Sequence, residues 1–187
     1  MNWPSVKLGE VFEVARGGSP RPISDFITDE PNGVNWISIK DASNSEKYIR
    51  NTKLKIRPEG VSRSRMVYPG DFLLSNSMSF GRPYIMKTEG CIHDGWLALS
   101  SDPKIVDPNY FYHLLGSELM YRKFSALSAG AVVKNLNISL VKTVEFLLPP
   151  LEEQKRIAAV LDKADAIRRK RQQAIELADQ FLRSVFL

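Results

Sequence analysis

The residues best suited to chemistry gather in one short segment, Cys91-Ile92-His93-Asp94. It holds the single cysteine and one of the two histidines of the 187-residue chain. A thiolate, an imidazole and a carboxylate can all bind zinc, and a thiol near an imidazole can act as a nucleophile. Zinc sites need three or four clustered ligands, however, and no further ligands or orienting base accompany this segment in the sequence. We therefore expect no metal and no cofactor, and we expect Cys91 to be a buried residue beside a strand end.

Other catalytic patterns are equally incomplete. The glycines at 9, 17 and 18 form no G-x-G-x-x-G loop, and no G-x-x-x-x-G-K-[ST] loop occurs. Asp107-Pro108-Asn109-Tyr110 approaches the Asp/Asn-Pro-Pro-Tyr/Phe tetrapeptide of amino-methyltransferases, but its second proline and a preceding cofactor loop are missing. No Asp-x(n)-Glu-x-Lys nuclease pattern is visible either. The sequence thus predicts a protein without catalysis, and a hydrolase or transferase using Cys91 or His93 stays the enzymatic alternative.

Composition indicates an ordinary globular protein, with 43% hydrophobic and 25% charged residues. The net charge of +5 permits a nucleic-acid partner without identifying one. Apolar runs fall far short of the roughly 20 residues that span a bilayer, and the N-terminus does not look like a signal peptide. One unpaired cysteine favours a reducing compartment, so we expect a cytoplasmic protein that does not contact membranes.

The chain divides at Pro149-Pro150. Residues 151–187 contain no Pro or Gly and are rich in helix-forming residues, which predicts one helix on the order of 50 Å long. Alternating steps of three and four define a stripe, called the seam here, in which eight of nine residues are apolar: Ile157, Val160, Ala164, Ile167, Arg171, Ala174, Ala178, Phe181 and Val185. A seam of about four heptads predicts coiled-coil packing against a second helix. The alternative is a helix packed along its own domain, with Arg171 reaching out to solvent.

Residues 1–150 carry Gly/Pro turn signals between short segments. Alternation and β-branched or aromatic residues predict strands at 34–39, 72–75, 84–87, 96–99 and 144–148. A helix is expected over 109–124, capped by Asp107 with Pro108 in its first turn. Without strict βαβ alternation, the expected class is α+β, with a globular domain at 1–150 and a long helix at 151–187.

Several stretches, taken in order, resemble the specificity subunits of type I restriction–modification enzymes. Leu148-Pro149-Pro150-Leu151-Glu152-Glu153-Gln154-Lys155-Arg156-Ile157 is similar to the Pro-Pro-Leu-x-Glu-Gln-x-x-Ile signature that leads from a target-recognition domain into its conserved helix. Three weaker matches precede it: Lys7–Phe12 with Arg16–Pro20, Pro69–Ser75 with Phe80–Arg82, and Gly130 with Lys134–Asn137. The Gly-Ser/Thr pair often seen near the last loop is Gly130-Ala131 here, which puts a hydroxyl contact there in doubt.

The resemblance implies a non-catalytic subunit that reads half of a bipartite target in double-stranded DNA and scaffolds modification (methyltransferase) and restriction/translocase subunits. It implies a homodimer through the long helix, or pairing with a second half of the same subunit. Residues with suitable donors are the expected DNA contacts, most of them in loops, and Lys40 is expected to close the strand around Trp36. They are Arg16, Ser19, Arg21, Lys40, Asn76, Ser77, Ser79, Arg82, Lys134 and Asn135. The rival interpretation is a coiled-coil protein-interaction adaptor without sequence-specific DNA binding.

Overall fold

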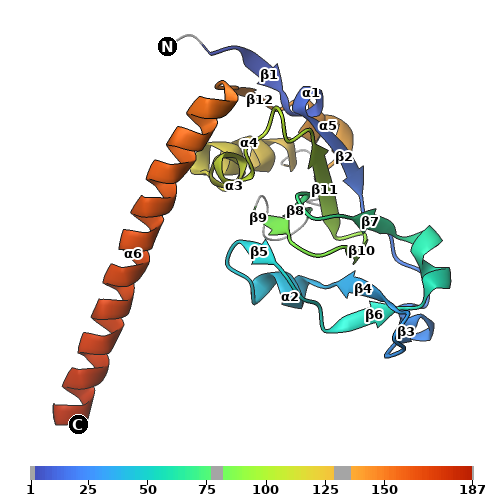
Figure 1. Cartoon of the computed structure of the whole chain (residues 1–187), viewed down its shortest axis with the longest axis horizontal. Coiled ribbons are helices and arrows are strands. Elements are labelled where there is room, and N and C mark those ends of the chain that lie inside the picture. The colour runs from blue at the N-terminus through green and yellow to red at the C-terminus, as the bar shows by residue number, and fades with distance from the viewer. Residues whose placement is uncertain (1–2, 77–81, 129–135, 187) are drawn as a thin grey trace.

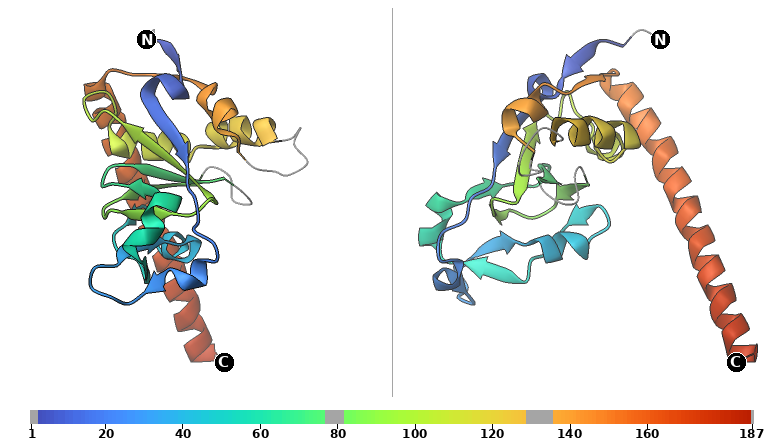
Figure 2. Two further views of the ribbon diagram at one scale, coloured as in Figure 1. Left: turned by 90° about the vertical axis from the view of Figure 1, so that its right-hand side faces the viewer. Right: turned by 180° about the vertical axis from the view of Figure 1, so that it is seen from behind.

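The computed structural model describes residues 3–76, 82–128 and 136–186, and all structural statements below concern these residues. The fold is α+β, as the sequence predicts. Figure 1 shows two stacked sheets, a layer of helices above them, and one long helix along the side. The C-terminal end of that helix extends past the rest of the chain in every view (Figures 1 and 2).

The strands form three sheets. The first five-stranded sheet has the order β2 (Phe12–Arg16), β11 (Trp96–Ser101), β8 (Phe72–Ser75), β9 (Pro83–Met86) and β5 (Tyr48–Ile49). The second has the order β3 (Ile27–Thr28), β6 (Leu54–Ile56), β4 (Val34–Ile37), β10 (Gly90–Ile92) and β7 (Arg65–Val67). A two-stranded sheet pairs β1 (Ser5–Lys7) with β12 (Glu145–Leu147) in antiparallel fashion, which brings the start of the chain beside the segment that leads into the long helix.

Six α-helices lie among the described residues, and they are α1 (Leu8–Val11), α2 (Ile39–Ser43), α3 (Pro108–Leu115), α4 (Glu118–Ser128), α5 (Ile138–Lys142) and α6 (Leu151–Phe186). Two short 3-10 helices, η1 (Ile23–Asp25) and η2 (Pro58–Arg63), belong to the connections of the second sheet. The expected cap of α3 is present, because the Asp107 carboxylate accepts a hydrogen bond from the backbone N–H of Tyr110 at 2.8 Å.

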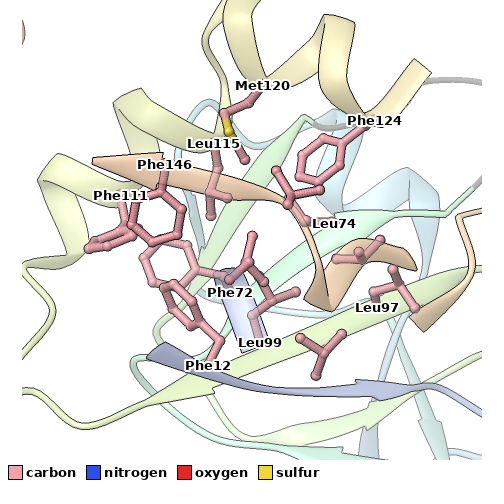
Figure 3. Packing of buried hydrophobic residues seen from close by; sticks show 14 of the residues in the cluster. Phe12, Phe72, Leu74, Leu97, Leu99, Phe111, Leu115, Met120, Phe124 and Phe146 are labelled. Atoms are coloured by element: carbon pink, nitrogen blue, oxygen red, sulfur yellow. The ribbon is translucent and has the colours of Figure 1, made fainter. Parts of the chain in front are cut away.

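The first sheet is buried on both faces, which explains why β8 reads as an unbroken apolar run. One face packs against α3 and α4 through an aromatic group in which the ring of Phe12 lies edge-on to Phe72 at 5.8 Å and to Phe111 at 5.0 Å (Figure 3). The other face meets the second sheet through a cluster that includes Trp96 and Ile37. The strands that carry the loops discussed below therefore start from a rigid, doubly covered sheet.

Two predictions about local structure are wrong in detail. The helix expected over 109–124 is two helices, because Gly116 ends α3 and Ser117 caps α4. The Ser117 hydroxyl accepts from the N–H of Met120 at 3.3 Å. The strand expected over 34–39 ends at Ile37. Ser38 and Asp41 then cap α2 reciprocally, so Lys40 lies in a short helix and does not close the strand.

Candidate nucleic-acid interface

Two consecutive glycines carry the chain from the end of β2 across the turn that follows β10. The N–H of Gly17 donates to the carbonyl of Trp96 at 3.0 Å, and the N–H of Gly18 donates to that of Ile92 at 3.1 Å. The backbones are so close that a Cβ on Gly17 would lie 2.0 Å from the carbonyl oxygen of His93. Only a residue without a side chain fits there, and the loop after β2 is thereby fixed against the turn at 93–95.

Asp94, in that turn, is the meeting point of four predicted site residues. Its backbone carbonyl accepts from Arg16 Nε at 2.9 Å and from Asn76 Nδ2 at 2.8 Å. Its carboxylate accepts from Ser19 Oγ at 3.2 Å and pairs with an Nη of Arg21 at 3.5 Å. We call these five residues the Asp94 junction. They come from three segments of the sequence and meet at one place on the surface.

A fourth segment joins the Asp94 junction through the main chain. Asn76 donates its N–H to the carbonyl of Gly95 at 3.0 Å, and its own carbonyl accepts from the N–H of Leu136 at 2.9 Å. The chain just before α5 is therefore held beside the chain that follows β8. Asn76 is only 1% exposed, and its amide is already used within the protein, which favours a structural role for this residue over a contact with DNA.

His93 lies beneath the junction between two indoles, with ring centroids 6.2 Å from Trp36 and 6.0 Å from Trp96. Its Nδ1 accepts from the N–H of Gly95 at 2.9 Å, so the neutral ring carries its proton on Nε2. Burial lowers the pKa of His93 below 6.5, an effect that the nearby carboxylate of Asp94 opposes. His93 thus supports the turn as a neutral acceptor.

The other predicted DNA contacts lie apart from the junction or outside the described residues. Lys40 is exposed on α2. Arg82 lies over the ring of Tyr84 at 5.2 Å and lines a cleft of about 550 Å³ shared with α3, α4 and α6. The remaining four, Ser77, Ser79, Lys134 and Asn135, fall in the parts of the chain that the structure does not describe.

The seam of α6 is largely uncovered. Val160, Ile167, Phe181 and Val185 are 54–65% exposed, and every residue from 166 to 186 is exposed. Ile157, the first residue of the seam, is half-buried and packs against the domain core. Otherwise the helix touches the rest of the chain with a different face, which carries buried Gln154 and Ala158 and half-buried Asp162 and Asp165. The described part of the chain therefore leaves most of the seam exposed.

The attachment of α6, called the helix joint here, centres on Gln154, which is 1% exposed. Its Oε1 accepts from the N–H of Asp107 at 2.9 Å, and its Nε2 donates to the carbonyls of Ile105 and Pro149, both at 2.9 Å. Every hydrogen-bonding atom of this amide is used, and the three partners come from the segment before α3 and the one before α6. The glutamine of the Pro-Pro-Leu signature therefore orients the helix.

A second polar cluster holds α6 two turns further along. Asp162 accepts from His113 Nε2 at 2.8 Å and from Lys47 Nζ at 3.0 Å, and Arg169 pairs with Glu46 at 3.1 Å. Burial alone would raise the pKa of Asp162, but the hydrogen bonds from His113 and Lys47 outweigh it, and the pKa lies below 3.8. The cluster ties α6 to α3 and to the chain before β5.

The sequence missed the roles of Asp94, Gln154 and the His113–Asp162 pair. In the sequence, Asp94 is only the neighbour of a Cys-x-His pair, whereas in the structure Cys91 is fully buried against Met66 and His93 accepts a hydrogen bond within the turn. Among the described residues, no three His, Cys, Asp or Glu side chains gather as a metal ion would require. Nor does the described part of the chain hold a helix that is long and apolar enough to cross a bilayer.

The chain is similar in sequence to known proteins. The family model described as "Type I restriction modification DNA specificity domain" matches residues 1–177. The MjaIX specificity subunit of Methanocaldococcus jannaschii, a type I restriction enzyme component, is 28% identical over 99% of this chain and 43% of its own length. The StySPI specificity subunit of Salmonella potsdam is 26% identical over 98% of this chain and 41% of its own length. The chain thus spans less than half of these relatives.

Two solved structures share the fold of this chain. The HsdS subunit from Thermoanaerobacter tengcongensis superposes with a TM-score of 0.72 and 25% identity, over 92% of this chain and 39% of that one. A chain from a study of complex assembly and conformational transition in the type I restriction–modification system superposes with a TM-score of 0.77 at 24% identity. That alignment covers 98% of this chain and 43% of the solved chain, and it shows a shared fold.

Proposed function

The chain belongs to the type I restriction–modification DNA specificity family, and from this membership we propose that it recognises one half of a bipartite target in double-stranded DNA. The observation that carries the proposal is the convergence of Arg16, Ser19 and Arg21 on the single turn at Asp94. Two exposed guanidinium groups and a half-buried hydroxyl on one frame suit DNA, because cations bind phosphates while hydroxyls and guanidinium groups read base edges. The chain itself supplies no catalysis.

Modification and restriction subunits are the proposed partners, and they would carry out the methylation and cleavage that this chain directs. Because its DNA substrate lies there, we place the protein in the cytoplasm. In this proposal residues 1–150 form the recognition domain and residues 151–187 form a spacer helix. The helix joint fixes the direction in which that spacer leaves the domain, and so sets where the DNA-reading surface stands relative to whatever covers the seam.

A second helix is the proposed occupant of the seam, from another copy of this chain or from the second half of a longer subunit. Four large apolar residues that are more than half exposed on one helix face favour such a partner. If the partner is a second copy, two-fold symmetry places identical recognition domains at the two ends of the helix pair. The bound DNA sites would then be two copies of one half-site in inverted orientation.

Ile167→Glu tests this pairing, because it puts a charge in the middle of the seam. We expect dimers of the wild-type chain and monomers of the variant by light scattering at tens of micromolar. Gln173→Glu is the matched control, since it adds the same charge on the same exposed helix away from the seam, and it should stay dimeric. A wild-type chain that is monomeric throughout this range would contradict pairing between copies.

DNA recognition is tested with a pool of duplexes that carry a randomised central segment. The full chain is incubated with the pool, alone and together with the modification subunit of the same host, and the bound duplexes are sequenced. We expect enrichment of two short motifs at a fixed spacing, and tighter binding when the modification subunit is present. A bound fraction with the same sequence composition as the starting pool would refute the proposed function.

A further inference from the structure

In the Asp94 junction, the backbone carbonyl and the side-chain carboxylate of Asp94 bind different partners. The backbone carbonyl of Asp94 holds Arg16 and Asn76, whereas the carboxylate holds Ser19 with one oxygen and Arg21 with the other. The frame therefore does not depend on the carboxylate. The Asp94 side chain is 47% exposed and lies on the surface that we propose binds DNA, which is a polyanion. An acidic group at this position therefore needs an explanation other than folding stability.

We propose that the carboxylate of Asp94 is a positioning group that determines base specificity, by fixing Ser19 as a hydrogen-bond acceptor and by restraining Arg21. This inference rests on the proposed function, because it concerns how the same surface discriminates between bases. It assigns Ser19 to an exocyclic amino group, the N4 amino group of cytosine or the N6 amino group of adenine, and not to a keto oxygen.

The assignment of Ser19 follows from the direction of its hydrogen bond. An ionised carboxylate only accepts, so the hydroxyl proton of Ser19 points to Oδ1 of Asp94, at an O–O distance of 3.2 Å. The two lone pairs of the hydroxyl are then left to act as acceptors. A free serine hydroxyl can donate or accept and pairs with any base, but one whose proton is committed distinguishes amino from keto groups.

Arg21 is restrained in a different way. Its side chain is 82% exposed, and its pairing with Asp94 at 3.5 Å is long. Exposed pairs of this kind contribute little to folding stability, so the carboxylate can be removed without unfolding the protein. What it does instead is lower the local positive potential, which reduces the capture of arbitrary phosphates by this guanidinium. Weak binding to wrong sequences is part of specificity.

Asp94→Ala tests both effects, since it removes the carboxylate and keeps the backbone carbonyl. At the position of the enriched motif that Ser19 contacts, we expect the preference for amino-bearing over keto-bearing bases to fall about tenfold, toward no preference. Ser19→Ala should lose the same preference, and the double variant should lose no more than either single change. The matched control is Glu145→Ala, which removes an exposed carboxylate on β12.

Binding of the unselected pool gives a second readout. Asp94→Ala should bind it more tightly than wild type does, with a plot of log affinity against log salt that is steeper by about 0.9, as one added phosphate contact predicts. In an Arg21→Gln background this gain should vanish. If Asp94→Ala matches Glu145→Ala in both motif and salt slope, the inference is wrong. If instead the wild-type chain enriches no motif at all, it is the proposed function that fails.

Discussion

The Asp94 junction and the helix joint use hydrogen bonds in opposite ways. At the junction the backbone makes the frame, through Gly17, Gly18 and the turn at 93–95, and the side chains of Arg16 and Arg21 above it are exposed. At the helix joint a buried side chain, Gln154, makes all the bonds. From this difference we expect that the surface side chains of the junction can be substituted without loss of the fold. We expect that Gln154 at the helix joint cannot.

Under the proposed function, this contrast suits a module that reads different DNA sequences on one scaffold. A frame built from backbone groups and a glycine contact does not depend on which side chains the loop presents. If the direction of α6 sets the spacing between two half-sites, as proposed, the helix must keep one angle. A fully satisfied buried amide defines that angle better than exposed ion pairs do. Three predictions test the contrast, in order of decreasing effect.

Gln154→Leu should have the largest effect. The substitution preserves approximate volume but leaves the N–H of Asp107 and the carbonyls of Ile105 and Pro149 without their partner. Unpaired buried groups cost about 1–3 kcal/mol each, so we expect a loss on the order of 3 kcal/mol or more in the free energy of unfolding, measured by urea denaturation. Gln172→Leu, at an exposed position of the same helix, should change it by less than about 0.5 kcal/mol. A change in the free energy of unfolding at Gln154 as small as that at Gln172 would contradict the distinction between the helix joint and the Asp94 junction.

Gly17→Ala should rank second, since it attacks the frame of the junction and not its surface. The added Cβ would meet the carbonyl oxygen of His93 at 2.0 Å, and both are backbone-fixed, so the loop after β2 must move. Overpacking of this kind costs about 1–3 kcal/mol, and Arg16 and Ser19 would be displaced from Asp94. Ser19→Ala, which removes one partly exposed hydrogen bond, should cost less than about 1 kcal/mol in the same denaturation measurement. Equal losses would mean that side chains and not backbone form the frame.

The sequence predicts these two regions unequally. Helical periodicity locates α6 and its seam, because a long amphipathic stripe without Gly or Pro has no competing structure. The Pro-Pro-Leu signature points to Gln154 without saying what it binds, since two of its three partners lie 47 and 49 residues earlier. The contacts of the Asp94 junction are even harder to predict from the sequence. Arg16 and Asp94 are 78 residues apart, and their contact depends on how β2 and β11 pair, which local pattern does not encode.

The same limit explains the errors at Gly116 and Lys40. A glycine inside a helical pattern costs about 1 kcal/mol, a penalty that periodicity alone cannot weigh against the cap that Ser117 provides for α4. At Lys40, the alternation around Trp36 continues past the point where Ser38 and Asp41 close a capping box. In both places a side-chain hydrogen bond to the backbone decided where an element ends.

The third prediction, with the smallest effect, concerns pH and the support beneath the junction. Burial lowers the pKa of His93 below its ordinary 6.5, so the unfolded chain takes up a proton before the folded chain does. The unfolded state therefore binds more protons once the pH falls below about 6.5, and the free energy of unfolding declines from there through the folded-state pKa. Well above pH 6.5, His93 is neutral in both states and does not make the free energy of unfolding depend on pH. Protonation also removes the Nδ1 acceptor from the N–H of Gly95, which loosens the turn that carries Asp94.

His93→Asn isolates this contribution, because an asparagine oxygen can accept from the N–H two residues on and does not titrate. Subtracting the stability curve of the variant from that of wild type, between pH 7.5 and 5, should leave a difference that falls as the pH falls. In the contrast drawn above, the junction would then weaken with mild acid while the helix joint, built on an amide, would not. A flat difference curve would show that His93 keeps its ordinary pKa, and that the turn at 93–95 is held by its backbone bonds alone.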